Sequence, residues 1–93
     1  EIQEGIKNGV RKVNIDTDLR MASTGAVRRH LVENSSNFDP RKFLKEATNA
    51  MSDICADRFE AFGSAGNADK ISVSSLDTMS QRYASGELDA NVK

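Results

Sequence analysis

The sequence predicts an α/β fold in which one β-strand lies among helices and belongs to a larger parallel sheet or barrel. Residues 10–16 alternate apolar and polar side chains as a strand does, whereas most other segments show helical spacing. A lone strand cannot satisfy its own backbone N–H and C=O groups, so its partner strands must come from residues outside this sequence. The helix–strand–helix order is typical of the last unit of a parallel sheet or barrel.

The first two predicted elements are a helix at residues 1–8 and the strand at residues 10–16. Gly9 lies between them and suits the C-terminal cap of the helix. In the strand, Val13 and Ile15 point to one face, because side chains alternate in direction along an extended chain. The opposite face is polar and consists of Lys12, Asn14 and Asp16.

Three further helices are predicted, at residues 18–33, 40–62 and 74–85. Asp39 and Pro40 give the second of them a strong start signal, an N-cap residue followed by proline at the first helical position. Ser74 and Asp77 have the spacing of a capping box at the start of the third.

Charge and composition exclude several kinds of partner. Thirteen basic and fourteen acidic residues give a net charge of −1, so we expect neither nucleic acid nor an anionic membrane as a partner. Cys55 is the only cysteine, and the resulting lack of an intrachain disulfide favours a cytoplasmic location. His30 and Cys55 together cannot supply the three or four ligands of a zinc site. We expect His30 to be a packing or surface residue and Cys55 a small core residue.

Polar side chains gather where the predicted strand meets the next helix. Asn14 and Asp16 share the polar face of the strand, and Thr17 follows at once. In parallel α/β folds, ligands bind at the C-terminal ends of strands, and a helix N-terminus attracts phosphate. Two interpretations stay open: these residues form a cradle for hydroxyl and phosphate groups, or they form a simple turn whose Asn, Asp and Thr cap the helix, with Thr17 or Asp18 as the N-cap.

Residues 9–20, with Asn-Ile-Asp-Thr-Asp at residues 14–18, look like the last barrel strand of class II fructose-bisphosphate aldolases. Residues 38–45 resemble a helix start in that family, and residues 58–68 resemble the stretch that closes its longer, Calvin-cycle-type members. The resemblance implies that residues 1–93 are the C-terminal portion of a (β/α)8 TIM barrel, comprising its last strand with flanking and terminal helices.

The resemblance also implies an activity, the reversible aldol cleavage of fructose 1,6-bisphosphate to dihydroxyacetone phosphate and glyceraldehyde 3-phosphate in glycolysis, gluconeogenesis or the Calvin cycle. In that reaction a zinc ion polarises the ketone and an acidic side chain moves the proton. The zinc ligands and the catalytic acid match no position here, so we expect this segment alone to be inactive. A monovalent cation is a possible second cofactor. The expected partners are the rest of the barrel, a sugar bisphosphate and further copies in a dimer or larger homo-oligomer.

The resemblance assigns substrate-binding roles to five residues. Asn14 would hydrogen-bond the hydroxyl or enediolate oxygen of the dihydroxyacetone phosphate half, and Asp16 would hold substrate hydroxyls. Thr17 would bind the phosphate of that half through its hydroxyl and amide. Arg20 and Arg41 are candidates for the other phosphate, which in this family is often reached by an arginine of the neighbouring subunit.

Alternatives stay open for both arginines and for the function as a whole. Arg20 could instead pair with Asp16 or Asp18, and Arg41 could be a solvated residue in the first turn of its helix. The whole chain could belong to the sister enzyme that cleaves tagatose bisphosphate. It could also be a stand-alone helical interaction module without catalytic activity.

Overall fold

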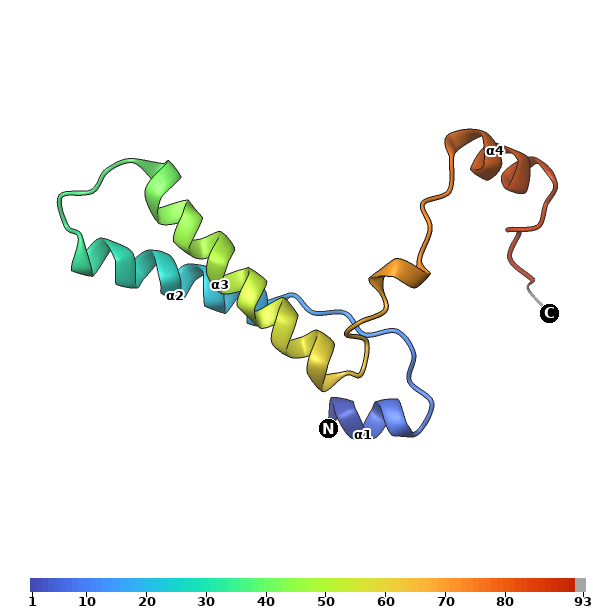
Figure 1. Cartoon of the computed structure of the whole chain (residues 1–93), viewed down its shortest axis with the longest axis horizontal. Helices are drawn as coiled ribbons and strands as arrows, with labels where there is room; N and C mark the ends of the chain where they lie inside the picture. Colours follow the sequence, from blue (N-terminus) through green and yellow to red (C-terminus); the bar gives the residue numbers. More distant parts are fainter. Residues whose placement is uncertain (92–93) are drawn as a thin grey trace.

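The computed structural model describes residues 1–91, which form helices joined by turns and extended segments (Figure 1). The helices predicted from the sequence differ from the observed ones by at most two residues at either end. In chain order, the described elements are α1 (Ile2–Lys7), α2 (Thr17–Glu33), α3 (Pro40–Ala61), the short 3-10 helix η1 (Ala68–Lys70) and α4 (Leu76–Ala84).

The predicted fold class is wrong. Residues 10–16 are extended but pair with no other segment, and residues 1–91 contain no β-strand, so the described residues show neither an α/β sheet nor a portion of a (β/α)8 barrel. The physical reason is that a strand exists only with a partner for its backbone groups, and none of the described segments provides one. The alternation that suggested a strand is nevertheless visible in burial, since Val13 and Ile15 are half-buried while Lys12 and Asn14 are exposed.

Helices α2 and α3 form an antiparallel hairpin, which is the one extensively packed helix pair in the described chain (Figure 1). The buried apolar residues of the described chain are Ala26 of α2 and Ala47 of α3. Alanine lets two helix backbones approach closely, because its side chain fills little of the space between them. The most buried positions of the hairpin therefore carry small side chains.

Both ends of α3 are set by local sequence. Asp39 is the N-cap, and one carboxylate oxygen accepts a hydrogen bond from the Arg41 backbone N–H at 3.0 Å, while Pro40 occupies the first turn. At the other end Gly63 has a φ of 74°, a left-handed conformation that favours glycine. The chain then turns back, and the Ser64 N–H donates to the Phe59 carbonyl at 3.0 Å.

Beyond this turn the chain continues as an arm, residues 68–91, which contains η1 and α4 and projects away from the hairpin (Figure 1). Helix α4 begins at Leu76 rather than at the predicted residue 74. Its N-cap is Ser75, whose hydroxyl oxygen accepts a hydrogen bond from the Thr78 N–H at 3.1 Å. None of the described helices is long and apolar enough to cross a membrane.

The chain is extended and buries little of its own surface. Its radius of gyration is 19.4 Å, against about 12 Å for a compact domain of this length. It exposes 8108 Å², whereas a compact protein of this mass exposes roughly 5,300 Å². No side chain among the described residues is fully buried. The described residues therefore do not enclose a hydrophobic core of their own.

Candidate functional site

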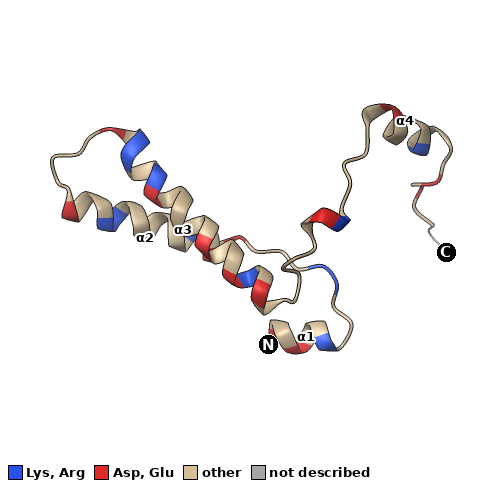
Figure 2. Cartoon of the chain, in the orientation of Figure 1, with Lys and Arg blue, Asp and Glu red and all other residues tan. Residues whose placement is uncertain are grey.

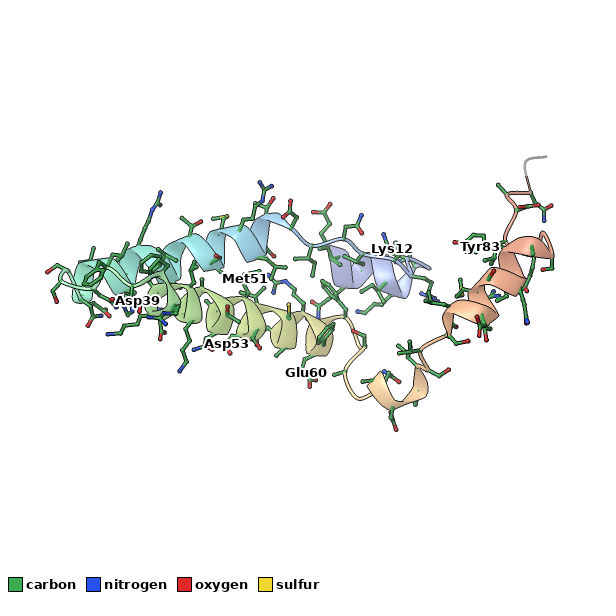
Figure 3. The ribbon with its side chains drawn as sticks, turned by 90° about the horizontal axis from the view of Figure 1, so that it is seen from above. Lys12, Asp39, Met51, Asp53, Glu60 and Tyr83 are labelled. Carbon is green, nitrogen blue, oxygen red and sulfur yellow. The ribbon has the colours of Figure 1, made fainter. Side chains whose placement is uncertain are left out.

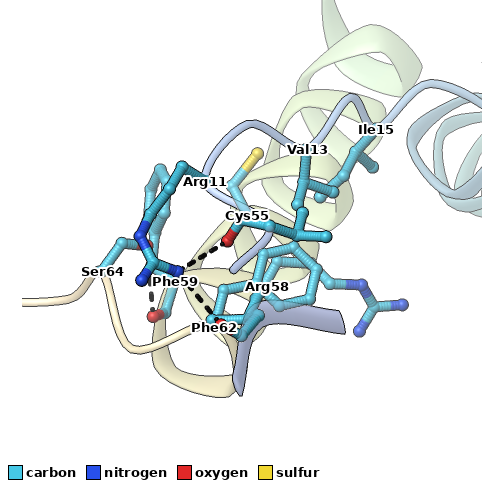
Figure 4. A pocket seen from close by; sticks show the side chains of 10 residues that line it. Arg11, Val13, Ile15, Cys55, Arg58, Phe59, Phe62 and Ser64 are labelled. Atoms are coloured by element: carbon cyan, nitrogen blue, oxygen red, sulfur yellow. Dashed lines mark hydrogen bonds between the residues drawn. The ribbon is translucent and has the colours of Figure 1, made fainter. Parts of the chain in front are cut away.

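The extended segment of residues 10–16 is held against the C-terminal part of α3 by its apolar side chains. Val13 and Ile15 line an open pocket of about 340 Å³ together with Cys55 and Phe59 of α3 (Figure 4). Arg11 closes one side of this pocket, where its guanidinium donates to the carbonyl oxygens of Ile6 and Val10, both at 3.1 Å. With Val13 and Ile15 fixed in this way, the polar side chains of the segment face the other side.

Asn14 is exposed on that polar side. The Lys12 ammonium donates a hydrogen bond to the Asn14 side-chain oxygen at 2.6 Å, so the two side chains lie together. The amide nitrogen of Asn14 makes no hydrogen bond within residues 1–91 and is available as a donor. An uncharged donor beside a lysine suits an oxygen atom that carries or develops negative charge.

Thr17 is the first residue of α2, directly after the Asp16 N-cap. The Asp16 side chain does not cap the helix; instead its carboxylate lies 2.9 Å from the Arg20 guanidinium, and both side chains are about seven-tenths exposed. The backbone N–H groups of the first turn therefore have no side-chain acceptor, and the positive end of the helix dipole is open to an anion. The N-cap expected at Thr17 or Asp18 is instead Asp16, one or two residues earlier.

Arg58 is a residue of this region that the sequence did not single out. Its guanidinium donates to the Asp18 carboxylate at 2.7 Å, which links α3 to the first turn of α2. The two residues are 40 positions apart, and only the packing of the hairpin brings them together, so no local pattern could have revealed the pair. The contact fixes the start of α2 relative to the extended segment that carries Asn14.

Arg41 lies away from the other four predicted site residues. It belongs to the first turn of α3, beside the end of α2 that is remote from Thr17, and the 17 residues of α2 span about 25 Å. Figure 3 shows its partner Asp39 at one end of the hairpin and Lys12 towards the other end. The structure therefore keeps residues 14–20, with the Asp16–Arg20 ion pair, at one end of the hairpin and separates Arg41 from them.

Arg41 and Asp39 form a two-pronged ion pair. The Arg41 Nε donates to Asp39 Oδ1 at 3.0 Å and its Nη2 donates to Oδ2 at 2.7 Å. Through its side-chain and backbone hydrogen bonds, Arg41 lowers the pKa of the Asp39 carboxyl below its ordinary value of 3.8. Asp39 in turn raises the pKa of the Arg41 guanidinium. The Arg41 side chain is 90% exposed and can still meet an anion from outside this chain.

The remaining candidates have structural surroundings. His30 lies in the last turn of α2, where its Nε2 is 2.6 Å from the side-chain nitrogen of Asn37 in the hairpin loop. Cys55 is half-buried beside Val13. No group of three or more His, Cys, Asp or Glu side chains gathers as a metal site in residues 1–91, so these residues do not fit a zinc ion. Acidic and basic side chains are interspersed along the helices without a large patch of one sign (Figure 2).

Comparison with known proteins gives a consistent result. A model of the family "Fructose-bisphosphate aldolase class-II" matches residues 1–67. The chain is 66% identical over 92 residues to a fructose-bisphosphate aldolase of Pseudomonas aeruginosa, covering 99% of this chain and 26% of that protein. It is 61% identical over 88 residues to fructose-bisphosphate aldolase 2 of Rhodobacter capsulatus, covering 95% of this chain and 77% of that sequence.

The chain therefore belongs to the class II fructose-bisphosphate aldolase family. It spans about a quarter of the length of the Pseudomonas aldolase and of the Stutzerimonas stutzeri aldolase, to which it is 65% identical. Its extended segment and hairpin lie within the part that the family model matches, whereas the arm of residues 68–91 lies beyond it.

Proposed function

We propose that the enzyme containing this chain catalyses the reversible aldol cleavage of fructose 1,6-bisphosphate, and that Asn14, Asp16, Thr17 and Arg20 form part of its substrate site. Family membership supports the reaction. The observation that carries the site is the exposed polar side of residues 12–16, which leads directly into the uncapped first turn of α2. The hydroxyl groups and the phosphate of one half of the substrate fit the hydrogen-bonding groups that follow one another along this surface.

Each of the four residues has a distinct task in this proposal. The Asn14 amide donates to the oxygen that becomes negatively charged as the carbon–carbon bond breaks. The Asp16 carboxylate accepts hydrogen bonds from substrate hydroxyls, and Thr17 binds the phosphate with its hydroxyl and the first-turn N–H groups. Arg20 is 2.9 Å from Asp16 and can exchange this carboxylate for a phosphate oxygen, because both side chains are exposed.

In this proposal, Arg41 binds substrate in the site of a neighbouring subunit and not in the site of its own chain. The length of α2 separates it from Thr17 of its own chain, so the two residues cannot bind one small substrate together. Its exposed guanidinium instead reaches a phosphate held by a neighbouring subunit, and Asp39 keeps it oriented until then. The enzyme is accordingly a homo-oligomer in this proposal.

The described residues supply no metal site, so no step of the reaction is assigned to a metal on this chain. We place the zinc ion and the proton-transferring carboxylate expected for the family in the rest of the enzyme. Asn14, Asp16 and Thr17 bind and orient substrate. All three are exposed in the chain, and exclusion of water from the site therefore depends on the rest of the enzyme as well.

The proposal is tested by replacing Asn14 with alanine in the intact enzyme. Loss of one donor to a developing oxyanion lowers kcat by about 10²–10³-fold in comparable sites, and we expect Asn14→Ala to do the same. Its stability should change little, because Asn14 is exposed and its observed side-chain partner is Lys12. Steady-state cleavage of fructose 1,6-bisphosphate and thermal unfolding measure the two effects.

Asn49→Ala is the matched control, since Asn49 is an exposed asparagine on α3 and lies away from the extended segment. We expect this variant to keep the parent's kcat. Near-normal cleavage by Asn14→Ala would remove Asn14 from the site. Absence of any cleavage by the parent enzyme would overturn the proposed reaction itself.

A further inference from the structure

Asn37 lies in the loop that joins α2 to α3, and its side chain forms hydrogen bonds towards both helices. On the α2 side, its amide nitrogen is 2.6 Å from Nε2 of His30, in the last turn of that helix. On the α3 side, its amide oxygen accepts a hydrogen bond from the backbone N–H of Asp39, the N-cap, at 3.2 Å. One side chain therefore connects the end of α2 to the start of α3.

The direction of these two hydrogen bonds follows from the chemistry of the amide group. The oxygen of an asparagine side chain only accepts, and its nitrogen only donates. Since the oxygen faces the Asp39 N–H, the nitrogen faces His30, whose Nε2 must then accept and whose imidazole is neutral with its proton on Nδ1. His30 and Asn37 are both half-buried, so water competes less for this contact than it would at a fully exposed position.

The connection continues from Asp39 to Arg41. The Asp39 carboxylate accepts hydrogen bonds from the backbone N–H and from the guanidinium of Arg41, at 3.0 Å and 2.7 Å. The Arg41 side chain is 90% exposed, and such a side chain has many rotamers whose restriction on binding costs free energy. A partner that holds the guanidinium in place before substrate arrives reduces this cost. Asn37 fixes the backbone of that partner from the side of α2.

We propose that Asn37 is a positioning residue for substrate binding and that His30 is its anchor on α2. Neither side chain touches substrate; both act on the place from which Arg41 reaches a phosphate. In the proposed function, on which this inference rests, Arg41 binds the phosphate of the substrate half that Thr17 does not hold. Loss of the Asn37 contact should therefore weaken the preference of the enzyme for a substrate that carries this second phosphate.

The test compares two substrates of the intact enzyme, fructose 1,6-bisphosphate and fructose 1-phosphate, which lacks the phosphate assigned to Arg41. The measured quantity is the ratio of kcat/KM for the first substrate to kcat/KM for the second. Asn37→Ala should lower this ratio roughly 3–10-fold, the effect of one lost hydrogen bond, mainly through a higher KM for the bisphosphate. A general loss of structure would instead lower kcat/KM for both substrates alike and leave the ratio unchanged.

Two further changes separate the Asn37 contact from the loop around it. His30→Gln keeps a hydrogen-bond acceptor and should keep the parent's ratio, whereas His30→Leu removes the acceptor and should lower the ratio as Asn37→Ala does. Asn34→Ala is the matched control, because Asn34 lies in the same loop and its side chain donates to the carbonyl oxygen of His30 rather than to α3. The backbone N–H of residue 34 also donates to that oxygen, at 2.8 Å, so this variant should keep the parent's ratio.

Arg41→Ala distinguishes failure of this inference from failure of the proposed function. It should lower the ratio about 10²-fold, because the phosphate loses a charged donor, and Asn37→Ala should have no further effect in that background. An unchanged ratio in Arg41→Ala would overturn the proposed role of Arg41 and this inference with it. If Arg41→Ala lowers the ratio, a parental ratio in Asn37→Ala, or an equal further loss in the double variant, would overturn the inference alone.

Circular dichroism checks that each variant is folded before its ratio is measured. If Asn37→Ala fails to fold, His30→Leu removes the same contact from the other side and takes its place. Unfolding of both variants would overturn the inference, because it would show that the contact maintains the fold and does not act through Arg41.

Discussion

At the scale of single residues, Asp39 links the shape of the hairpin to the placement of Arg41. Its carboxylate accepts the N-terminal hydrogen bond of α3 and three further hydrogen bonds from the Arg41 guanidinium. Negative charge at the N-terminus of a helix is stabilised by the helix dipole, and hydrogen bonds to the charged form lower the pKa of the carboxyl. The ionised form of Asp39 is therefore the form that caps α3 and forms the ion pair with Arg41.

The first prediction concerns the pH dependence of this cap. Asp39→Ala should lower the midpoint at which the intact enzyme loses its helical circular dichroism signal on heating at pH 5–7, because α3 loses its N-cap. The pKa of Asp39 is lowered in the folded state from 3.8, so its stabilising effect is complete above about that pH and is lost as pH falls through the lower folded-state value. The difference between parent and variant should therefore shrink below pH 3.8.

Asp57→Ala is the control for this measurement, because Asp57 is an exposed aspartate further along α3 that makes no ion pair in the described chain. Its midpoint should follow the parent's across the same pH range. A parent–variant difference for Asp39→Ala that disappears already above pH 4 would contradict the assigned role.

At the scale of elements, helices α2 and α3 pack against each other, and the most buried residue of each is an alanine. Ala47 is 5% exposed and meets a helix that presents Ala26, also 5% exposed, so a larger side chain has no space there. Overpacking a close contact of this kind costs about 1–3 kcal/mol. The geometry of the hairpin thus rests on residues whose main contribution is their small size.

Ala47→Leu in the intact enzyme should accordingly loosen the hairpin. Hydrogen exchange of the α2 and α3 amides should accelerate, because local opening becomes less costly. Ala56→Leu makes the same change at an exposed position on α3 and should leave exchange near the parent's rate. Equal exchange in the parent and in Ala47→Leu would show that Ala47 does not set the approach of the two helices.

The helices were predictable because their signals are local. Asp39 and Pro40 mark the start of α3, and Gly63 marks its end, whatever the rest of the protein does. The lack of a strand at residues 10–16 was not predictable. Alternation of apolar and polar residues shows which side chains share a face, but not whether a partner strand is present. Asn14, Asp16, Thr17 and Arg20 could be grouped from their proximity in sequence, whereas the Arg58–Asp18 pair and the separation of Arg41 depend on hairpin packing.

At the scale of the whole molecule, the chain has elements of secondary structure without a core. A stand-alone helical module would bury its large apolar side chains, yet Phe38, Met21 and Val32 are exposed on the hairpin. The net stability of a fold is a small difference between burial and the loss of conformational entropy, and a chain that buries so little cannot offset that loss. We infer that the arrangement described here depends on contacts with residues beyond those of this chain.

Calorimetry of the isolated 93-residue chain tests this central claim most directly. A self-contained domain of this size would unfold with a heat-absorption peak and a heat-capacity increase of about 1.1–1.4 kcal/mol/K. We predict a trace without a cooperative peak, because the described residues enclose no core. A sharp transition from a monomeric, compact chain would contradict the account and would identify the chain as an independent helical module.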